Sequence, residues 1–386
     1  MRFDTVIIGA GPVGSALAVS LGRQNKNVMI IDANSISKPK VESKKLAISY
    51  GSKVILENLG IWGNIEQRTP IKEVHVSHKG FFGRTIISHE VLDIPALGYV
   101  IPQNLLQRQL MLEAKKLGVE ILEKCLVTDV SVKGNKALIN CNQNKKTFEI
   151  DSNLAVIADG GSSLANNSIK KFKEKSFDQE AIICTVKCDR KHSNTAYERF
   201  TEHGPIALLP FGDEYVLVWT GQAADCEERY AANTKIFLQS LQKHFGWRAG
   251  RFQSVKEKKR VRLFMRYAKD VISDRLVVLG NAAQTLHPVA AQGFNLGLRD
   301  VKDFADLSKK NQCADLGAPN FLVKYKASRV ADRSFGIGFT DLLTRVFSNN
   351  DGPLVITRGF ALFMLDALPY LKKIFIQRMI FGGKFT

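Results

Sequence analysis

The sequence lacks several features that would place it in a common class of protein. None of its six cysteines belongs to a Cys-x-x-Cys pair, and no neighbouring histidine completes a zinc-binding pattern. No uninterrupted apolar run reaches about 18 residues, so we expect no membrane-spanning helix. Strand-forming residues begin at Phe3, which leaves no room for a secretory signal. These absences predict a reduced, cytoplasmic protein without a metal site.

Acidic residues are scarce relative to basic ones. The chain has 37 Asp and Glu against 55 Lys and Arg, which gives a formal net charge of +18 at pH 7. Such an excess favours anionic partners, for example a phospholipid surface or a phosphate-bearing cofactor, but a basic host proteome would produce the same excess. No basic block is interleaved with aromatic residues, so we do not expect nucleic-acid binding.

The hydrophobic pattern indicates two kinds of sheet. Short Val- and Ile-rich runs without polar alternation are typical of parallel strands buried on both faces; they lie at 3–8, 28–31, 153–157 and 276–279. After residue 176 the β runs are separated by Gly-Pro and Gly-Asp turns, which indicates an antiparallel sheet; they lie at 181–186, 206–210 and 215–220. Helices are expected at 12–24, 52–59 and 105–117, from about 295, and from Asn320 to the end.

The first chemical motif is Gly9-x-Gly11-x-x-Gly14, directly after the first expected strand. The first glycine permits a tight turn, the second lets the backbone approach a pyrophosphate, and the third lets helix and strand pack closely. The helix N-terminus offers N–H groups to the phosphates. Asp32, at the end of the second expected strand, can accept hydrogen bonds from ribose hydroxyls. The motif predicts a bound dinucleotide without separating FAD from NAD.

Residues 275–300 supply a second strand–loop–helix unit, RLVVLGNAAQTLHPVAAQGFNLGLRD. The expected strand ends at Gly280, the loop contains His287-Pro288, and the helix opens near Gly293. A reduced flavin carries negative charge at N1 and at the C2 oxygen, and a helix N-terminus aimed there would stabilise it. This second unit favours FAD.

The segment resembles the flavin-binding signature of the aromatic-ring flavoprotein monooxygenases, the p-hydroxybenzoate-hydroxylase-like group. Within that group it most resembles the ubiquinone-biosynthesis hydroxylases. Where the usual pattern is Gly-Asp-Ala-Ala-His, this chain has Gly-Asn-Ala-Ala-Gln at 280–284. Ala158-Asp159-Gly160 resembles the family's Asp-Gly motif, and 196–200 with 204–210 resembles the substrate-domain sheet. The resemblance covers nearly the whole chain.

The resemblance implies an α/β fold with a Rossmann-like FAD-binding domain, an inserted antiparallel-sheet substrate domain and a C-terminal helical segment. The expected FAD-binding domain comprises residues 1–72, 98–176 and 268–318. The expected substrate domain comprises 73–97 and 177–267, and the C-terminal segment comprises 319–386.

The resemblance also implies an FAD-dependent monooxygenase of ubiquinone biosynthesis. FAD would be bound tightly but non-covalently, NAD(P)H would be a transient donor, and O2 would form a flavin C4a-hydroperoxide that attacks a phenol ring. The implied reaction converts 2-polyprenyl-6-methoxyphenol to 2-polyprenyl-6-methoxy-1,4-benzoquinol. The isoprenoid tail implies contact with an anionic membrane surface, at the inner face of the membrane, or with a lipid-carrier protein, and the family implies a multi-hydroxylase assembly.

Candidate site residues follow from these motifs. The candidate cofactor-binding residues are Gly9, Gly11, Gly14, Asp32, Lys44, Gln107, Asp159, Asn281, Pro288, Gly293, Phe294 and Asn295. His287 is the candidate catalytic proton partner because histidine titrates near neutrality; a structural loop role is the alternative. Leu208, Pro210 and Trp219 are candidates to line an apolar substrate pocket, with ordinary core packing as the alternative.

Four positions depart from the family pattern. Lys44 stands where an arginine is usual, and it keeps the charge but loses the bidentate fork. Gln103 and Asn166 also stand where related enzymes carry arginine, and Ala291 replaces a glycine of the flavin loop. These departures concern the positioning of the flavin.

Three rival functions remain. One is a sibling hydroxylase that acts at another ring position. Another is a prenyl-lipid reductase on the same fold. The third is a non-catalytic flavoprotein or assembly subunit, which the departures make conceivable.

Overall fold

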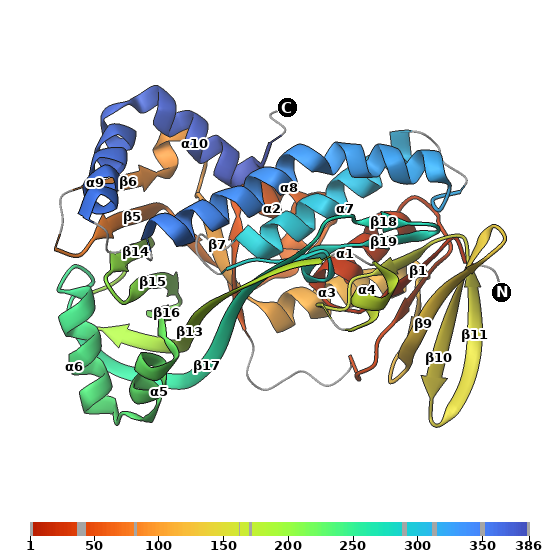
Figure 1. Cartoon of the computed structure of the whole chain (residues 1–386), viewed down its shortest axis with the longest axis horizontal. Coiled ribbons are helices and arrows are strands. Elements are labelled where there is room, and N and C mark those ends of the chain that lie inside the picture. The colour runs from red at the N-terminus through yellow and green to blue at the C-terminus, as the bar shows by residue number, and fades with distance from the viewer. Residues whose placement is uncertain are drawn as a thin grey trace.

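The computed structural model describes residues 3–36, 44–80, 83–161, 163–169, 172–287, 292–310, 315–347 and 352–383. Two large sheets are joined by the long strands β13 (Phe172–Cys188) and β17 (Phe252–Ala268), and the C-terminal helices lie across the top in Figure 1. The predicted fold class, α/β with an antiparallel sheet and a C-terminal helical segment, is confirmed.

The six-stranded sheet is built around β1 and contains the predicted first βαβ unit. Its strand order is β18 (Ile272–Ser273), β19 (Leu276–Val278), β12 (Ala155–Ile157), β1 (Thr5–Ile8), β2 (Val28–Ile31) and β8 (Glu120–Leu122). All of its pairs are parallel except β18 with β19. Every residue of β1, β12 and β19 is buried, which explains their apolar sequences without alternation.

The helices beside this sheet pack on one another. The helix α1 (Pro12–Gly22) contacts α3 (Gln103–Lys116) and α7 (Gln292–Lys310), and α7 contacts α8 (Pro319–Phe347). Every α1 residue from Gly14 to Gly22 is buried, so α1 lies within the largest hydrophobic core. The shorter helical segments are α2 (Tyr50–Asn58), α4 (Ser163–Ser168) and the 3-10 turns η1 (Trp62–Asn64), η2 (His89–Leu92) and η3 (Gly280–Ala282).

The eight-stranded sheet contains the predicted antiparallel strands. Its order is β20 (Gln284–Thr285), β17, β13, β16 (Glu214–Gln222), β15 (Gly204–Phe211), β14 (Thr195–Thr201), β5 (Glu73–His78) and β6 (Arg84–Ser88). Only the pair β14 with β5 is parallel. One face of the sheet packs on α5 (Ala223–Ala231) and α6 (Thr234–Phe245). Its edge strand β20 comes from the 280–287 loop, so the sheet reaches the predicted flavin loop.

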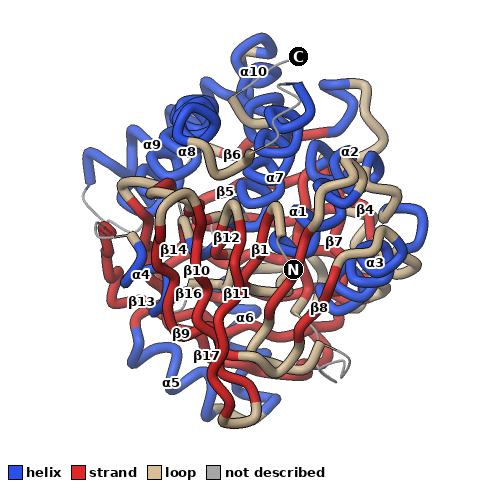
Figure 2. Tube along the Cα trace, turned by 90° about the vertical axis from the view of Figure 1, so that its right-hand side faces the viewer, coloured by secondary structure: helices blue, strands red, loops and turns tan. Residues whose placement is uncertain are grey.

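Two small sheets complete the β structure of the described ranges. One has the order β3 (Lys45–Ser49), β7 (Gly98–Pro102) and β4 (Thr69–Ile71). The other, β9 (Leu126–Lys133), β10 (Lys136–Gln143) and β11 (Lys146–Ser152), lies at the end of the molecule far from α6 (Figures 1 and 2). The sequence pattern did not predict β10 and β11, because both contain residues that are untypical of strands, for example Asn140 and Asn142 in β10 and Glu149 and Asp151 in β11.

The chain ends in α9 (Gly352–Ala367) and α10 (Pro369–Phe381). Ile376 and Ile380 of α10 are buried against Leu97, and the Ile380 carbonyl accepts a hydrogen bond from Ser49 Oγ at 2.9 Å. Over the stretches that the structure describes, no helix is long and apolar enough to cross a membrane.

A buried network of charges joins α7 to α8. Arg329, which is 2% exposed, donates to Asp300 at 2.8 Å and to Asp303 at 2.7 Å. Its third donor bonds Asp332 at 2.8 Å, and Arg299 donates to the same carboxylate at 2.9 Å. A buried carboxylate that loses its partner is strongly destabilising, so this interface depends on Arg329.

Replacing Arg329 with methionine is therefore expected to lower the free energy of unfolding by about 3–5 kcal/mol, because the buried Asp300 and Asp332 and the partly buried Asp303 lose a partner. Urea denaturation at pH 7 measures this loss. The matched control is Lys302→Met, which removes an exposed α7 ion pair with Asp306 and should cost less than about 1 kcal/mol. Equal losses for the two variants would contradict the role given to Arg329.

Candidate functional site

The glycine turn between β1 and α1 is fixed by backbone contacts at two of its three glycines. Gly9 has a φ of +109°, and a Cβ there would lie 2.5 Å from the Ala158 carbonyl oxygen. A Cβ on Gly14 would lie 2.1 Å from the Gly9 carbonyl oxygen. A Cβ on Gly11 would meet nothing within 4 Å. Packing therefore requires Gly9 and Gly14, while Gly11 faces open space in the position where a pyrophosphate would approach.

Asp32 and Gln107 both contact this turn through Ala10. Asp32 Oδ2 accepts a hydrogen bond from the Ala10 amide at 2.8 Å, and its Oδ1 accepts one from the Asn34 amide at 2.8 Å. Gln107 of α3 donates to the Ala10 carbonyl at 2.8 Å. Three candidate elements, far apart in sequence, thus meet at one turn. Lys44 is exposed just before β3.

The 280–287 loop meets the glycine turn at Val13. A Cβ on Gly280 would lie 3.1 Å from two Val13 methyl carbons, and one on Gly297 would lie 2.9 Å from the nearer of them. The Asp159 turn adjoins the same loop, because a Cβ on Gly161 would lie 3.2 Å from the Asn281 carbonyl oxygen. Asp159 itself accepts a hydrogen bond from the Gly161 amide at 3.0 Å. The three predicted motifs meet at the carboxyl edge of the parallel strands, and the open Gly11 side of that edge fits FAD.

The start of α7 is tied to the small β3–β7–β4 sheet by Asn295. Its Oδ1 accepts hydrogen bonds from the Ser49 amide at 2.8 Å and from Ser52 Oγ at 2.7 Å, and its Nδ2 donates to the Ala47 carbonyl at 3.3 Å. These contacts explain why an amide stands at this position. Gly293 and Phe294 are half-buried in the same turn of helix. Pro288 and Ala291 lie outside the described residues, as does the side chain of Asn166.

His287 occupies a more apolar position than its loop suggested. The side chain is 1% exposed, and its ring packs edge-on against Phe177 at 5.3 Å between centroids. Burial lowers the pKa of His287 to about 4. The expectation that it titrates near neutrality is therefore wrong, because the imidazole is neutral at pH 7. A neutral ring can still donate or accept one hydrogen bond at the loop.

The three candidate substrate residues lie on the far face of the eight-stranded sheet. Leu208 and Trp219 are fully buried in the core that α5 and α6 cover. The Arg229 guanidinium lies 4.3 Å from the centre of the Trp219 ring. Pro210 shares the face of Leu208 because strand residues alternate. The structure does not bring these three side chains together with the glycine turns, and ordinary core packing accounts for them.

Sequence reasoning missed the partner that fixes the 280–287 loop. Gln284, which is fully buried, donates to Asp300 at 2.7 Å and accepts from Arg333 Nε at 2.9 Å. The Gly280 amide also donates to Asp300, at 3.4 Å. The sequence showed that Gln284 departs from the usual family pattern. Its partners Asp300 and Arg333 belong to α7 and α8, so the loop sequence alone could not predict them.

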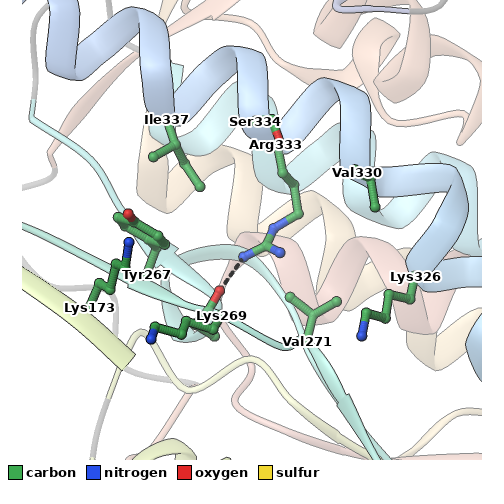
Figure 3. Close-up of a pocket in the computed structure, with 10 residues that line it drawn as sticks. Lys173, Tyr267, Lys269, Val271, Lys326, Val330, Arg333, Ser334 and Ile337 are labelled. Carbon is green, nitrogen blue, oxygen red and sulfur yellow. Dashed lines mark hydrogen bonds between the residues drawn. The ribbon is translucent and has the colours of Figure 1, made fainter. Parts of the chain in front are cut away.

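A cleft of about 330 Å³ lies between α8 and the ends of β13 and β17 (Figure 3). Its lining includes Lys173, Lys269, Lys326 and Arg333, and none of the candidate site residues takes part. Arg333 donates to the Ala268 carbonyl at 3.1 Å, as the dashed line in Figure 3 marks. The cleft is thus separate from the candidate site residues, although its lining residues Arg333, Ala268 and Tyr267 contact Gln284 and Ala283 of the 280–287 loop.

The glycine geometry generates a paired prediction. Gly11→Ala is expected to keep the thermal stability of the FAD-free protein but to lower FAD affinity at least about tenfold, because the added methyl meets only the cofactor. Gly14→Ala should destabilise the FAD-free protein as well, because its Cβ would overlap the Gly9 carbonyl. Thermal melts of FAD-free protein and fluorescence titration with FAD measure both effects. Wild-type FAD affinity in Gly11→Ala would contradict the assigned position of the pyrophosphate.

Known proteins resemble this chain over nearly its whole length. It is 28% identical to the ubiquinone hydroxylase UbiL of Rhodospirillum rubrum, over 97% of this chain and 88% of the relative. It is 26% identical to the 3-demethoxyubiquinol 3-hydroxylase of Escherichia coli, over 96% of each chain. The solved structure of p-nitrophenol 4-monooxygenase PnpA from Pseudomonas putida superimposes with a TM-score of 0.79, at 15% identity, over 99% of this chain and 98% of the other. That last likeness shows the fold.

A family model described as an FAD binding domain matches residues 2–310, which include all three motifs. This match confirms FAD as the cofactor, and with the relatives above it confirms the predicted resemblance and the class of FAD-dependent monooxygenase. The chain therefore belongs to the FAD binding domain family.

Proposed function

We propose that this protein is an aromatic-ring monooxygenase of ubiquinone biosynthesis that converts 2-polyprenyl-6-methoxyphenol to 2-polyprenyl-6-methoxy-1,4-benzoquinol with NAD(P)H and O2. The observation that carries the proposal is the meeting of the open Gly11 turn, the Asp159 turn and the 280–287 loop beside the eight-stranded sheet. A flavin ring held at this edge lies next to a sheet face able to bind an aromatic ring. The named activities of the relatives support the same reaction class.

The chemistry that bound FAD would supply is acceptance of a hydride from the nicotinamide donor and activation of O2 for transfer of one oxygen atom to an electron-rich ring. This chain's residues supply the binding and the orientation. The Gly11 backbone and the α1 N-terminus hold the pyrophosphate, and Asp32 accepts from a ribose hydroxyl. Asn281, Gly293 and Phe294 would border the ring, together with the α7 N-terminus. The buried, neutral His287 keeps this side of the site apolar and excludes water.

We also propose that one domain binds FAD and the other binds the substrate. Residues 1–72, 98–176 and 268–318 bind FAD, and 73–97 with 177–267 bind the substrate. The pairing of β5 with β14 supports this division, because it places residues 73–78 in the same sheet as 195–201. Residues 319–386 hold the two domains together through α8 and α10.

Deleting the gene is expected to make the host accumulate 2-polyprenyl-6-methoxyphenol, identified by its mass and fragmentation. The purified protein should oxidise NAD(P)H and consume O2 when given a short-chain form of that phenol. Accumulation of a precursor that lacks a different hydroxyl would assign the sibling reaction. Turnover without O2 consumption would favour a reductase, and an FAD-containing protein with no phenol-stimulated oxidation would favour a non-catalytic subunit.

The tail of the proposed substrate requires contact with a lipid phase, and the outer face of α9 and α10 suits it. This face exposes large apolar side chains, with Tyr370 75% exposed and Phe360 60% exposed. Phe363, Leu371 and Ile374 are also exposed, and Lys373 lies among them. Aromatic and aliphatic side chains mixed with lysine are typical of helices that lie in the membrane interface. The opposite face of α10 is buried, so the segment both caps the protein and presents an apolar surface.

We expect the protein to sediment with vesicles that contain phosphatidylglycerol and to bind pure phosphatidylcholine more weakly, because of its net charge of +18. The variant Tyr370→Ser/Lys373→Glu should lower this binding about tenfold, since it removes apolar area and reverses one charge. The matched control Ile236→Ser changes an exposed residue of α6 and should bind as the wild type does. Unchanged binding of the double variant would shift the assignment to a lipid-carrier protein or a hydroxylase assembly.

A further inference from the structure

Glu198 lies in the middle of a row of paired residues that crosses the eight-stranded sheet. It pairs with Val76 of β5 on one side and with Ala207 of β15 on the other. The row continues to Thr85 of β6 and to Val218 of β16. Paired residues of neighbouring strands project from the same face of a sheet. A carboxyl group therefore stands on an otherwise small and apolar stretch of one sheet face.

This face is the one turned toward the FAD-binding side. The neighbouring ring of Tyr197 packs against Tyr215 and Phe245 in the core under α5 and α6. Since successive strand residues alternate, Glu198 projects from the opposite face. Ala196 shares that opposite face and packs in a cluster with Val100 of β7.

The same cluster connects Glu198's face to the start of α7. Val100 pairs with Ala47 of β3, whose carbonyl accepts a hydrogen bond from Asn295. Asn295 lies in the first turn of α7, next to the 280–287 loop. The face that carries Glu198 and the loop that borders the flavin therefore share one side of the molecule.

The Glu198 carboxyl has an unusual environment for a glutamate. Within the described ranges, it forms no hydrogen bond and no ion pair. Burial alone raises its pKa to about 7, although the side chain keeps some accessible surface. Because the side chain keeps some accessible surface, a small ligand can reach the carboxyl group on this face. Other ionisable side chains on this face are His78 of β5, Lys259 of β17, and the pair Glu214 of β16 and Lys256 of β17, which lie 2.9 Å apart. Asp366 of α9 bonds Thr85 at the end of the row and Lys372.

The side chains beside Glu198 on β15 and β16 define the chemistry that would fit there. Ala207 and Leu209 of β15 and Val216 and Val218 of β16 alternate onto this face. They carry no charge that would pair with a carboxylate on the ligand. An aromatic ring with apolar substituents and one hydroxyl group matches these contacts, whereas an aromatic acid would leave its carboxylate unpaired.

We propose that Glu198 binds the phenolic hydroxyl of the substrate and accepts its proton. The inference rests on the proposed function and names the group that recognises the ring. The O–H bond of the phenol breaks, the proton passes to a Glu198 oxygen, and the electron pair stays on the phenolate oxygen. The phenolate donates electron density to its ring, which makes the ring a better nucleophile. The substrate class is a neutral phenol with apolar substituents.

Binding tests the inference without turnover. The FAD-loaded protein is titrated at pH 8 with a short-chain 2-alkyl-6-methoxyphenol and with its O-methyl ether, and the flavin absorbance is followed. The wild type should bind the phenol at least about tenfold more tightly than the ether, because only the phenol donates to Glu198. Glu198→Leu should bind both equally. A preference for the phenol that persists in Glu198→Leu overturns the inference, even if the protein proves to be inactive.

The pH dependence of turnover gives a second test. For the wild type, kcat/KM should rise through an apparent pKa near 7, where Glu198 loses its proton. Glu198→Gln should lose this rise and at least about 100-fold of kcat/KM, while FAD content and its reduction by NAD(P)H stay normal. Glu202→Gln, just beyond the end of β14, is the matched control and should keep the wild-type profile. A wild-type pH profile in Glu198→Gln overturns the inference, whereas a wild type that ignores every phenol overturns the proposed function instead.

Discussion

Close backbone contact at the first turn is the constraint on which the site depends. A Cβ on Gly9 would overlap the Ala158 backbone, and a Cβ on Gly14 would overlap the Gly9 carbonyl, so neither position accepts a larger residue. The close packing at these two glycines holds β1, α1 and β12 together at the centre of the parallel sheet. The same packing leaves free space beside Gly11. A phosphate group can therefore approach the backbone there without a cavity in the core. The Asp159 turn and the 280–287 loop lie at the same carboxyl edge of the parallel strands and complete the site.

Buried charge holds the second motif in place. Asp300 binds Gln284 of the loop with one oxygen and Arg329 of α8 with the other. Gln284 also accepts from Arg333, and a primary amide suits this position because it donates and accepts at once. The loop that borders the flavin is thereby coupled to the C-terminal helices. This coupling explains how a chain with Gln instead of the usual His can still hold that loop.

The parts of this structure that could be predicted from sequence are the local ones. The first βαβ unit and its three glycines follow from short-range pattern and sterics, and they stand where the sequence placed them. The alternation of β15 was equally readable, but alternation cannot tell which face a later helix will cover, and Leu208 turned to the α6 side. The low pKa of His287 depends on burial against Phe177 from a distant strand. The partners of Arg329 depend on helix packing. Contacts between residues far apart in the chain produce no periodic pattern in the sequence, so they could not be predicted from it.

We propose that the glycine turn and the 280–287 loop hold FAD so that one atom of O2 enters an aromatic ring. Turnover of a short-chain 2-alkyl-6-methoxyphenol under 18O2, followed by mass spectrometry of the product, tests it most directly. We expect a hydroquinone with one added oxygen, derived wholly from 18O2, and one NAD(P)H oxidised for each molecule formed. A product without 18O, or 18O recovered only as peroxide with the phenol unchanged, would contradict it.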